Sequence, residues 1–284
     1  MQQEFVDLYK YCGLNRPEGG TGYLSCCIQL TSQTISPRRL RPAVLIIPGG
    51  GYEHVSRREG EPVALRFLAR GYSTFVLEYS VAPARFPTQL QEAAMAMRYI
   101  RDHAAEFEID PGMVAAIGFS AGGHLCGMLG MLFDAPEVAQ IGTADQIRPN
   151  TLGLCYPVAV SWGATHEGSF ANLCGGDQVL RERLSLDRLV RPDMPPVYLW
   201  HTRSDESVPC RNSLILTNAL TEVGVPVAMR LYLRGRHGLS TADEQVYPEG
   251  KVPEMSPDVP YWPEEMLGFF REIGIKIKDL EQNL

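Results

Sequence analysis

The stretch "AAIGFSAGGHL", Ala115–Leu125, places a serine between two glycines at the end of an apolar run. Gly118, Ser120 and Gly122 fit the pattern G-x-S-x-G. A strand is predicted before this serine and a helix after it, so Ser120 lies on a sharp strand-to-helix turn. The free amides at the start of that helix point at the same spot. A helix N-cap is the ordinary alternative for such a serine, but the strand–turn–helix context favours an exposed nucleophile.

A glycine-rich loop upstream supplies donors that a serine nucleophile needs. "PGGGY", Pro48–Tyr52, follows the continuous apolar run Ala43–Pro48, which is typical of a buried strand. Attack on an ester puts negative charge on the carbonyl oxygen. Removing one preplaced hydrogen-bond donor to this oxygen typically raises the activation free energy by roughly 3–4 kcal/mol. We expect the N–H groups of one or both of Gly50 and Gly51, with that of Ala121, to form an oxyanion hole. A phosphate-binding loop is disfavoured, because neither G-K-[ST] nor G-x-G-x-x-G follows.

His237 is the best placed of the six histidines to act as a base. It lies in "LRGRHGLS", just past the last predicted strand and between two glycines, where a loop side chain can approach a hydroxyl. Asp205, in "LWHTRSDESVP" after the preceding strand, is the predicted acid that orients the imidazole. Glu206 and Asp243 are the alternatives for the acid. The chain order Ser120, Asp205, His237 is that of α/β-hydrolases rather than of other serine-hydrolase folds.

The rest of the chain alternates between strand-like and helix-like segments, which is typical of a parallel sheet with crossover helices. Strands are predicted at residues 23–30, 43–48, 72–80, 113–119, 152–160, 195–202 and 225–233. Helices are predicted at residues 56–71, 86–107, 120–133, 210–223 and 264–277. Ser56 and Glu59 fit a capping box, and Asp110–Gly112 fits a turn. We expect one α/β domain over residues 1–284: a mostly parallel central sheet of about eight strands flanked by helices, with residues 161–191 as a small partial lid.

Composition narrows the classes of partner. The net charge is −7 and the basic residues are scattered, so neither nucleic acid nor an anionic membrane is expected to bind. No apolar stretch reaches the roughly 20 residues of a membrane span, and no signal-peptide pattern is seen. Seven cysteines, without a C-x-x-C pair, indicate reduced thiols in a cytoplasmic protein. Neither a metal nor an organic cofactor is expected, and a homo-oligomer is compatible with the sequence.

These motifs together resemble a known family. "VLIIPGGGYEHVSRREGEPVALRFLARGYSTFVLEYSVAP", "GFSAGGHL", "HTRSDESVP" and "GRHGLS" are similar to segments of the α/β-hydrolase esterases related to feruloyl and acetylxylan esterases. The resemblance runs from about residue 40 to residue 272 and includes "THEGSFANLCGG", Thr165–Gly176. It implies that the serine, aspartate and histidine named above form a catalytic triad and that the glycine loop supplies the oxyanion hole. The loop lacks the histidine that precedes these glycines in lipase-like relatives, which favours the carbohydrate-esterase branch.

The resemblance implies a carboxylic ester hydrolase for short acyl groups, namely an acetylesterase acting on acetylated sugars or xylo-oligosaccharides. Tyr52, His54, Trp162 and His166 lie on the loops expected around the site and are candidates for contact with such a sugar. An amidase, a peptidase or an aryl formamidase of the same fold remains open, because a triad does not distinguish an ester from an amide. A non-catalytic binder on a hydrolase scaffold is the alternative from another class.

Overall fold

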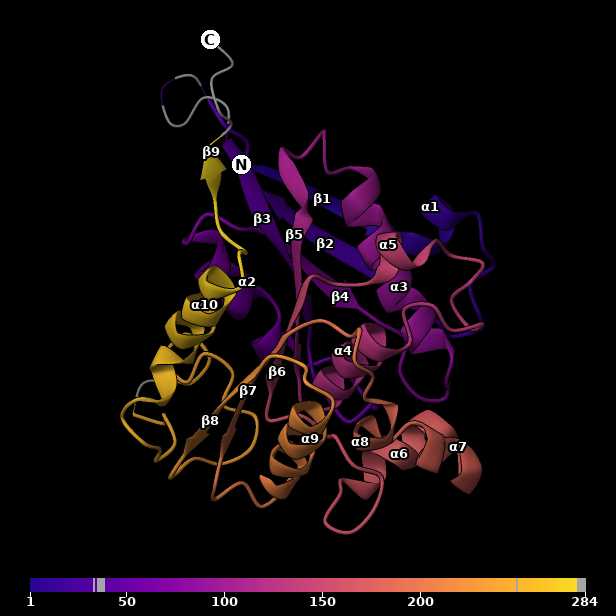
Figure 1. Ribbon diagram of the computed structural model, residues 1–284, viewed down its shortest axis with the longest axis vertical. Coiled ribbons are helices and arrows are strands. Elements are labelled where there is room, and N and C mark those ends of the chain that lie inside the picture. Colours follow the sequence, from indigo (N-terminus) through magenta and orange to yellow (C-terminus); the bar gives the residue numbers. More distant parts are fainter. Residues whose placement is uncertain (33, 35–38, 249, 280–284) are drawn as a thin grey trace.

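The computed structural model describes residues 1–32, 34, 39–248 and 250–279 (Figure 1). The strands are β1 (Gln2–Asp7), β2 (Tyr23–Ile28), β3 (Arg39–Ile47), β4 (Ser73–Glu78), β5 (Ile109–Phe119), β6 (Thr151–Cys155), β7 (Val197–Thr202), β8 (Val227–Tyr232) and β9 (Lys278–Asp279). The sheet runs in the order β1-β2-β4-β3-β5-β6-β7-β8, and β9 pairs with the start of β3. In this order the strands from β4 to β8 pair in parallel, whereas β2 pairs antiparallel with both β4 and the edge strand β1. This confirms the predicted α/β-hydrolase fold.

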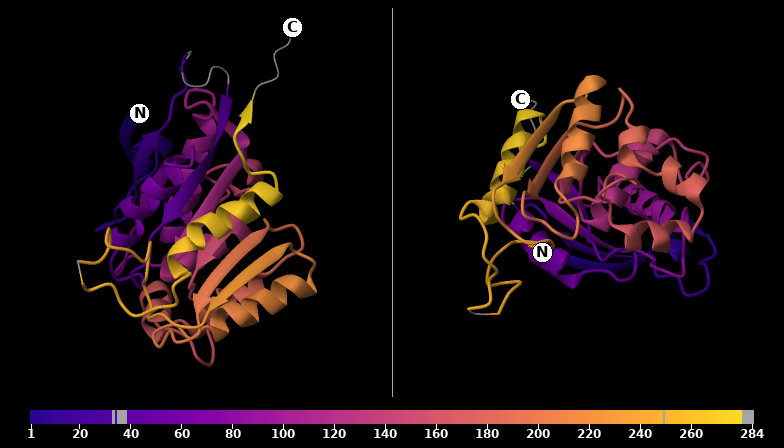
Figure 2. Two further views of the ribbon diagram at one scale, coloured as in Figure 1. Left: turned by 90° about the vertical axis from the view of Figure 1, so that its left-hand side faces the viewer. Right: turned by 90° about the horizontal axis from the view of Figure 1, so that it is seen from below.

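Helices cover both faces of the sheet (Figure 2). The α-helices are α1 (Leu8–Cys12), α2 (Glu61–Leu68), α3 (Thr88–Asp102), α4 (Ala121–Met131), α5 (Ala144–Ile147), α6 (Glu167–Cys174), α7 (Gln178–Arg183), α8 (Leu186–Leu189), α9 (Arg211–Glu222) and α10 (Trp262–Glu272), and the 3-10 helices are η1 (Arg57–Glu59) and η2 (Val259–Tyr261). Buried side chains of α2 and α10 form one core with one face of the sheet. Those of α1, α3, α4 and α9 form a second core on the opposite face.

Strand β3 shows why the sheet is the centre of the molecule. Leu45 and Ile47 belong to the core under α3 and α4, while Val44 and Ile46 belong to the core under α2 and α10. All four side chains are fully buried, because successive residues of a strand point to opposite faces and both faces carry helices. The continuous apolar run therefore carries the glycine loop to the carboxyl end of the sheet.

Three local predictions are wrong. Asp110–Gly112 is not a separate turn but lies within β5, where the register with β3 jumps from the Arg41–Ile109 pair to the Ala43–Val114 pair. The strand predicted at 152–160 ends at Cys155, two residues before a proline that cannot donate to a sheet ladder. The edge strand β1 was not predicted, because an exposed edge places little demand on its residue pattern.

The capping-box prediction is also wrong, and it bears on the site. Ser56 precedes the short helix η1 without a side-chain capping hydrogen bond. Glu59, which the pattern assigned to the exposed first turn of a helix, is only 3% exposed. A buried carboxylate requires hydrogen-bond donors, and those donors prove to be parts of the candidate active site.

The segment 161–191 carries the short helices α6, α7 and α8, which lie together at one end of the molecule (Figure 1). Phe170 and Leu173 of α6 are buried, and the Phe170 ring contacts that of His124 with a centroid separation of 5.2 Å. Through these contacts, helix α6 of segment 161–191 packs against the main core. All seven cysteines are free thiols. Within the ranges described above, no helix has both the length and the apolar character needed to cross a membrane.

Candidate active site

Ser120 lies at the turn from β5 into α4 in a backbone conformation that L-residues rarely adopt, with φ 53° and ψ −118°. Two glycines make this turn sterically accessible. A Cβ on Gly118 would lie 2.2 Å from the carbonyl oxygen of Gly122, and a Cβ on Gly122 would lie 2.2 Å from that of Pro48. Strain of this kind is concentrated at functional sites, and here it holds the hydroxyl at the carboxyl end of the sheet.

The structure brings Ser120, His237 and Asp205 together from three different loops. The Ser120 hydroxyl donates to His237 Nε2 at 2.8 Å, and His237 Nδ1–H donates to Asp205 Oδ2 at 2.7 Å. His237 follows β8 and Asp205 follows β7, so both side chains lie at the same strand ends as the serine. The second oxygen of Asp205 accepts the N–H groups of Ser207 and Val208 at 3.0 and 2.9 Å.

A second histidine supports Asp205 from behind. His201 is fully buried, and its Nε2 lies 2.8 Å from the carbonyl oxygen of Val208 and 3.3 Å from Asp205 Oδ2. Since a carbonyl only accepts, His201 carries its proton on Nε2, and Nδ1 accepts from the Ser213 hydroxyl at 2.8 Å. Burial alone would raise the pKa of Asp205, but hydrogen bonds from His201 and His237 outweigh it and hold that pKa well below its usual value. The ionised carboxylate fixes the tautomer of His237 with Nε2 free to accept.

The glycine loop offers amide donors beside the serine. Gly50 has φ 123° and Gly51 has φ 65°, and a Cβ on Gly50 would lie 2.0 Å from the carbonyl oxygen of His54, so only glycine fits there. Within the described ranges, neither N–H group donates to a protein acceptor. Ala121 is the first residue of α4, where an N–H has no intrahelical partner. These three amides are therefore open to an incoming oxygen.

Sequence reasoning missed the link between the two loops. Glu59 Oε2 accepts the Gly49 N–H at 2.9 Å, and Glu59 Oε1 accepts the Tyr156 hydroxyl at 2.7 Å. The same hydroxyl accepts the Ser240 N–H at 2.9 Å, and the Tyr156 ring packs edge-on against His237 with a centroid separation of 5.1 Å. We call this arrangement the Glu59–Tyr156 link, because it ties the glycine loop to the loop that carries His237. Nothing in the local pattern around Glu59 signals it.

A cavity of about 280 Å³ opens onto the serine. Its lining consists mainly of polar side chains and glycines: Gly50, Gly51, Glu53, His54, Ser56, Arg58, Glu59, Ser120, His166, Ser207, His237 and Gly238. Two predicted sugar contacts, His54 and His166, are among them. The Ser169 N–H donates to His166 Nδ1 at 3.2 Å, so the ring proton of the neutral form lies on Nε2. Burial, and then the nearby charge of His237, lowers the pKa of His166.

The other two predicted sugar contacts lie elsewhere. Tyr52 is 1% exposed, and its hydroxyl contacts His124 Nδ1 at 2.8 Å inside the core. Trp162 donates its indole N–H to Asp187 at 3.1 Å and does not line the cavity. Tyr52 is therefore buried away from the cavity, and Trp162 lies on the surface outside it. Proximity along the chain to the glycine loop or to segment 161–191 does not fix the direction of a ring.

Comparison with known proteins identifies the family. The BD-FAE family model matches residues 30–148, and the prolyl oligopeptidase family model matches residues 91–251. An acetyl ester-xyloside bifunctional hydrolase from Caldicellulosiruptor lactoaceticus has a crystal structure that matches with a TM-score of 0.80 and 32% identity, covering 96% of this chain and 97% of that one. The chain belongs to the α/β-hydrolase esterases.

Curated relatives of this α/β-hydrolase esterase include larger proteins. It is 36% identical over 218 residues to endo-1,4-beta-xylanase B of Butyrivibrio fibrisolvens, a match that covers 73% of the chain and 34% of the xylanase. It is 28% identical over 204 residues to an acetylxylan esterase of Xylanibacter ruminicola, covering 69% of the chain and 40% of that esterase. The esterase chain described here thus spans less than half the length of these two curated relatives.

Proposed function

We propose that the protein is a serine esterase that removes short acyl groups, above all acetyl, from the hydroxyl groups of sugars or xylo-oligosaccharides. The observation that carries the proposal is the hydrogen-bonded series from Asp205 through His237 to Ser120, at 2.7 and 2.8 Å, beside open main-chain amides. The names of the relatives from Xylanibacter ruminicola and Caldicellulosiruptor lactoaceticus support an acetylated sugar as the substrate.

The proposed reaction proceeds in two halves. His237 Nε2 takes the proton of Ser120 as Oγ attacks the ester carbonyl, and the N–H groups of Ala121 and the glycine loop stabilise the oxyanion. Asp205 stabilises the imidazolium that forms. His237 then gives its proton to the departing sugar oxygen, which leaves an acetyl-serine. Water attacks this ester with His237 again as the base, so acetate is released and the Ser120 hydroxyl is restored.

The size and chemistry of the cavity favour a short acyl group. A volume of about 280 Å³ lies just below the usual range for ligand sites, and the polar lining of the cavity suits a sugar better than a long alkyl chain. We treat residues 1–284 as one domain in which segment 161–191, through His166, forms a partial lid over this cavity. Seven free thiols favour a reducing, cytoplasmic location.

Amide hydrolysis is the second candidate, because the prolyl oligopeptidase family model matches residues 91–251, which include all three proposed triad residues. A panel of substrates separates the two: p-nitrophenyl acetate, butyrate and octanoate, acetylated xylobiose, aminoacyl amides and a formylated arylamine. An esterase of the proposed kind prefers acetate and acetylated xylobiose. Faster turnover of the amides would replace the esterase by a peptidase or an aryl formamidase.

The catalytic role of Ser120 is tested with the Ser120→Ala variant and a fluorophosphonate probe. Wild-type protein should label and hydrolyse p-nitrophenyl acetate, and the variant should do neither. A protein that binds sugar without reacting with the probe would be a non-catalytic binder. Hydrolysis retained by the folded variant would refute the assignment of the nucleophile.

A further inference from the structure

We propose that a groove leading from the catalytic cavity across the edge strands binds the main chain of a neutral, acetylated polysaccharide, beyond the sugar that carries the ester. We call it the edge groove and define it by its strand residues Gln3, Phe5, Ser25, Cys27, Thr74 and Val76. The inference rests on the proposed function for its position relative to the scissile ester. The ligand it assigns is a linear chain of uncharged sugars.

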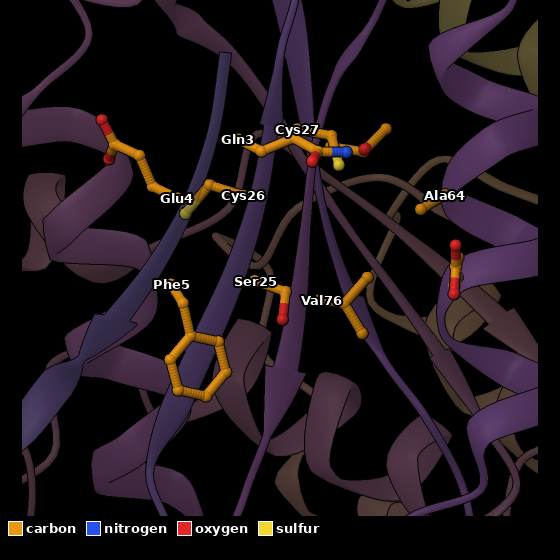
Figure 3. A pocket seen from close by; sticks show the side chains of 10 residues that line it. Gln3, Glu4, Phe5, Ser25, Cys26, Cys27, Ala64 and Val76 are labelled. Atoms are coloured by element: carbon orange, nitrogen blue, oxygen red, sulfur yellow. The ribbon is translucent and has the colours of Figure 1, made fainter.

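Three neighbouring cavities share lining residues, and we infer that they form one path. The catalytic cavity shares Ser56 with a second cavity of about 300 Å³. That second cavity shares Ser25, Glu61 and Val76 with a third of about 460 Å³, which lies over β1, β2 and β4 beside α2 (Figure 3). The larger cavity is lined by neither Ser120 nor His237, so it is distinct from the catalytic cavity.

The floor of the edge groove is the face of β1, β2 and β4 that lies beside helix α2. Strand pairing places residues of β1, β2 and β4 side by side in two rows. One row is Gln3, Cys27 and Thr74, and the next is Phe5, Ser25 and Val76. Figure 3 shows Phe5, Ser25 and Val76 on neighbouring strands, with Ala64 of helix α2 across from them. From Glu78 to Thr74 the path follows β4 for about 13 Å, which is longer than a single sugar ring.

Two features of this floor call for a ligand of sugar-like chemistry. The Phe5 ring is 65% exposed and stacks on Tyr23 with a centroid separation of 5.1 Å, which presents a flat aromatic surface to the apolar face of a sugar ring. Thr74 is 1% exposed, yet among the described residues its hydroxyl has no hydrogen-bond partner. An unpaired buried hydroxyl is costly. Thr74 lines the third cavity, so a small rotation of its side chain would let a sugar hydroxyl in the edge groove pair with it.

The charges along the path disfavour other ligands. Glu61, Glu78 and Arg57 all line the second cavity, so carboxylates outnumber the guanidinium there. A polyanion such as a nucleic acid would be repelled. An apolar helix would bury the hydroxyls of Ser25 and Thr74 without partners. An uncharged sugar chain avoids both problems. It carries no negative charge to be repelled, and it offers hydroxyl groups to the polar side chains as well as apolar ring faces to Phe5.

The first test compares substrates of increasing length. We measure kcat/KM for xylobiose, xylotetraose and xylohexaose that each carry one acetyl group. The enzymes compared are wild type, Phe5→Ala and Thr74→Val. Leu231→Ala, which removes an exposed side chain on the opposite edge strand, is the control. We expect kcat/KM to rise with length in wild type and in the control. Phe5→Ala should reduce kcat/KM for the hexaose roughly three- to tenfold, and Thr74→Val by a few fold, with p-nitrophenyl acetate hydrolysis unchanged.

A binding measurement separates this proposal from the proposed function. Unacetylated xylohexaose is titrated into Ser120→Ala protein with and without Phe5→Ala, followed by calorimetry and by sedimentation. Weaker binding with Phe5→Ala supports the edge groove even if no acetyl ester is cleaved by the wild-type protein. Equal kcat/KM for all lengths, or equal binding with and without Phe5, would overturn it. So would a dimer that Phe5→Ala dissociates without any change in sugar binding, since this face would then be an interface between two copies.

Discussion

Replacing Glu59 by glutamine tests whether the Glu59–Tyr156 link holds the candidate active site in its working geometry. The substitution keeps the size of the side chain and removes one acceptor oxygen. The remaining oxygen can accept either the Gly49 N–H or the Tyr156 hydroxyl, which Glu59 now accepts at 2.9 and 2.7 Å. The new NH₂ group then either opposes the Gly49 N–H or donates to the Tyr156 hydroxyl, whose own proton loses its acceptor. In either arrangement the link loses one charge-assisted hydrogen bond.

The expected magnitude follows from the lost contact. A hydrogen bond to a charged, buried group contributes about 1.5–3 kcal/mol, so we expect the free energy of unfolding to fall by about 2 kcal/mol. Displacement of the glycine loop or of the His237 ring by about 1 Å can cost roughly 100-fold in rate. We therefore expect kcat for p-nitrophenyl acetate to fall roughly 10- to 100-fold, with a smaller change in KM, because the loops act on the oxyanion and the base.

The assay must separate positioning from misfolding. Active sites are counted with a fluorophosphonate, kcat is expressed per active site, and urea unfolding gives the stability of each variant. Glu78→Gln, which alters an exposed carboxylate on a nearby strand, is the matched control. Tyr156→Phe removes the same hydrogen bond from the other side, so the double variant should lose much less than the sum of the two single losses. A Glu59→Gln enzyme with kcat per site within twofold of wild type would refute the reasoning.

Three further changes probe other parts of the site. Gly50→Ala places a Cβ 2.0 Å from the His54 carbonyl oxygen, so kcat should fall at least roughly 100-fold with probe labelling slowed in parallel; unchanged kcat would exclude this loop from the oxyanion hole. Asp205→Asn should lower kcat by roughly 10⁴-fold in steady-state assays, because the tautomer of the base is no longer fixed. Burial lowers the pKa of His124 from 6.5 to about 4, so the unfolded chain binds the proton first as the pH falls. Stability should therefore be full above pH 6.5 and drop by about 3 kcal/mol towards pH 4 in urea unfolding, and His124→Gln should flatten this slope.

The parts of the site that follow strand ends were predictable from the sequence. Ser120, Asp205 and His237 each follow an apolar segment and lie among small or polar residues, and parallel strands end at the same edge of a sheet. A continuous apolar run such as 43–47 similarly predicts a strand covered on both faces. These inferences depend on local composition and chain order, which the sequence contains directly.

Contacts that depend on tertiary packing were not predictable in this way. The pattern Ser56-x-x-Glu59 is compatible with a helix cap and equally with a buried carboxylate that accepts hydrogen bonds. It contains no information about Tyr156, which lies 97 positions further along the chain. Tyr52 follows the glycine loop, but its positive φ of 56° accompanies a side chain directed into the core. The edge strand β1 has one face only partly covered, so its pattern of polar and apolar residues is weakly constrained.

The anchoring of Asp205 has a consequence for how the base can be replaced. The carboxylate is held by two main-chain amides and by His201, so most of its support does not come from His237. Replacing His237 by alanine would leave a space beside Asp205. The carboxylate of Asp205 would still be held in place and could accept a hydrogen bond from a ring bound there. Free imidazole added to the buffer could bind in this space and be oriented by Asp205 as the His237 ring normally is. Activity of the alanine variant would then depend on the imidazole concentration and could be turned on by adding it.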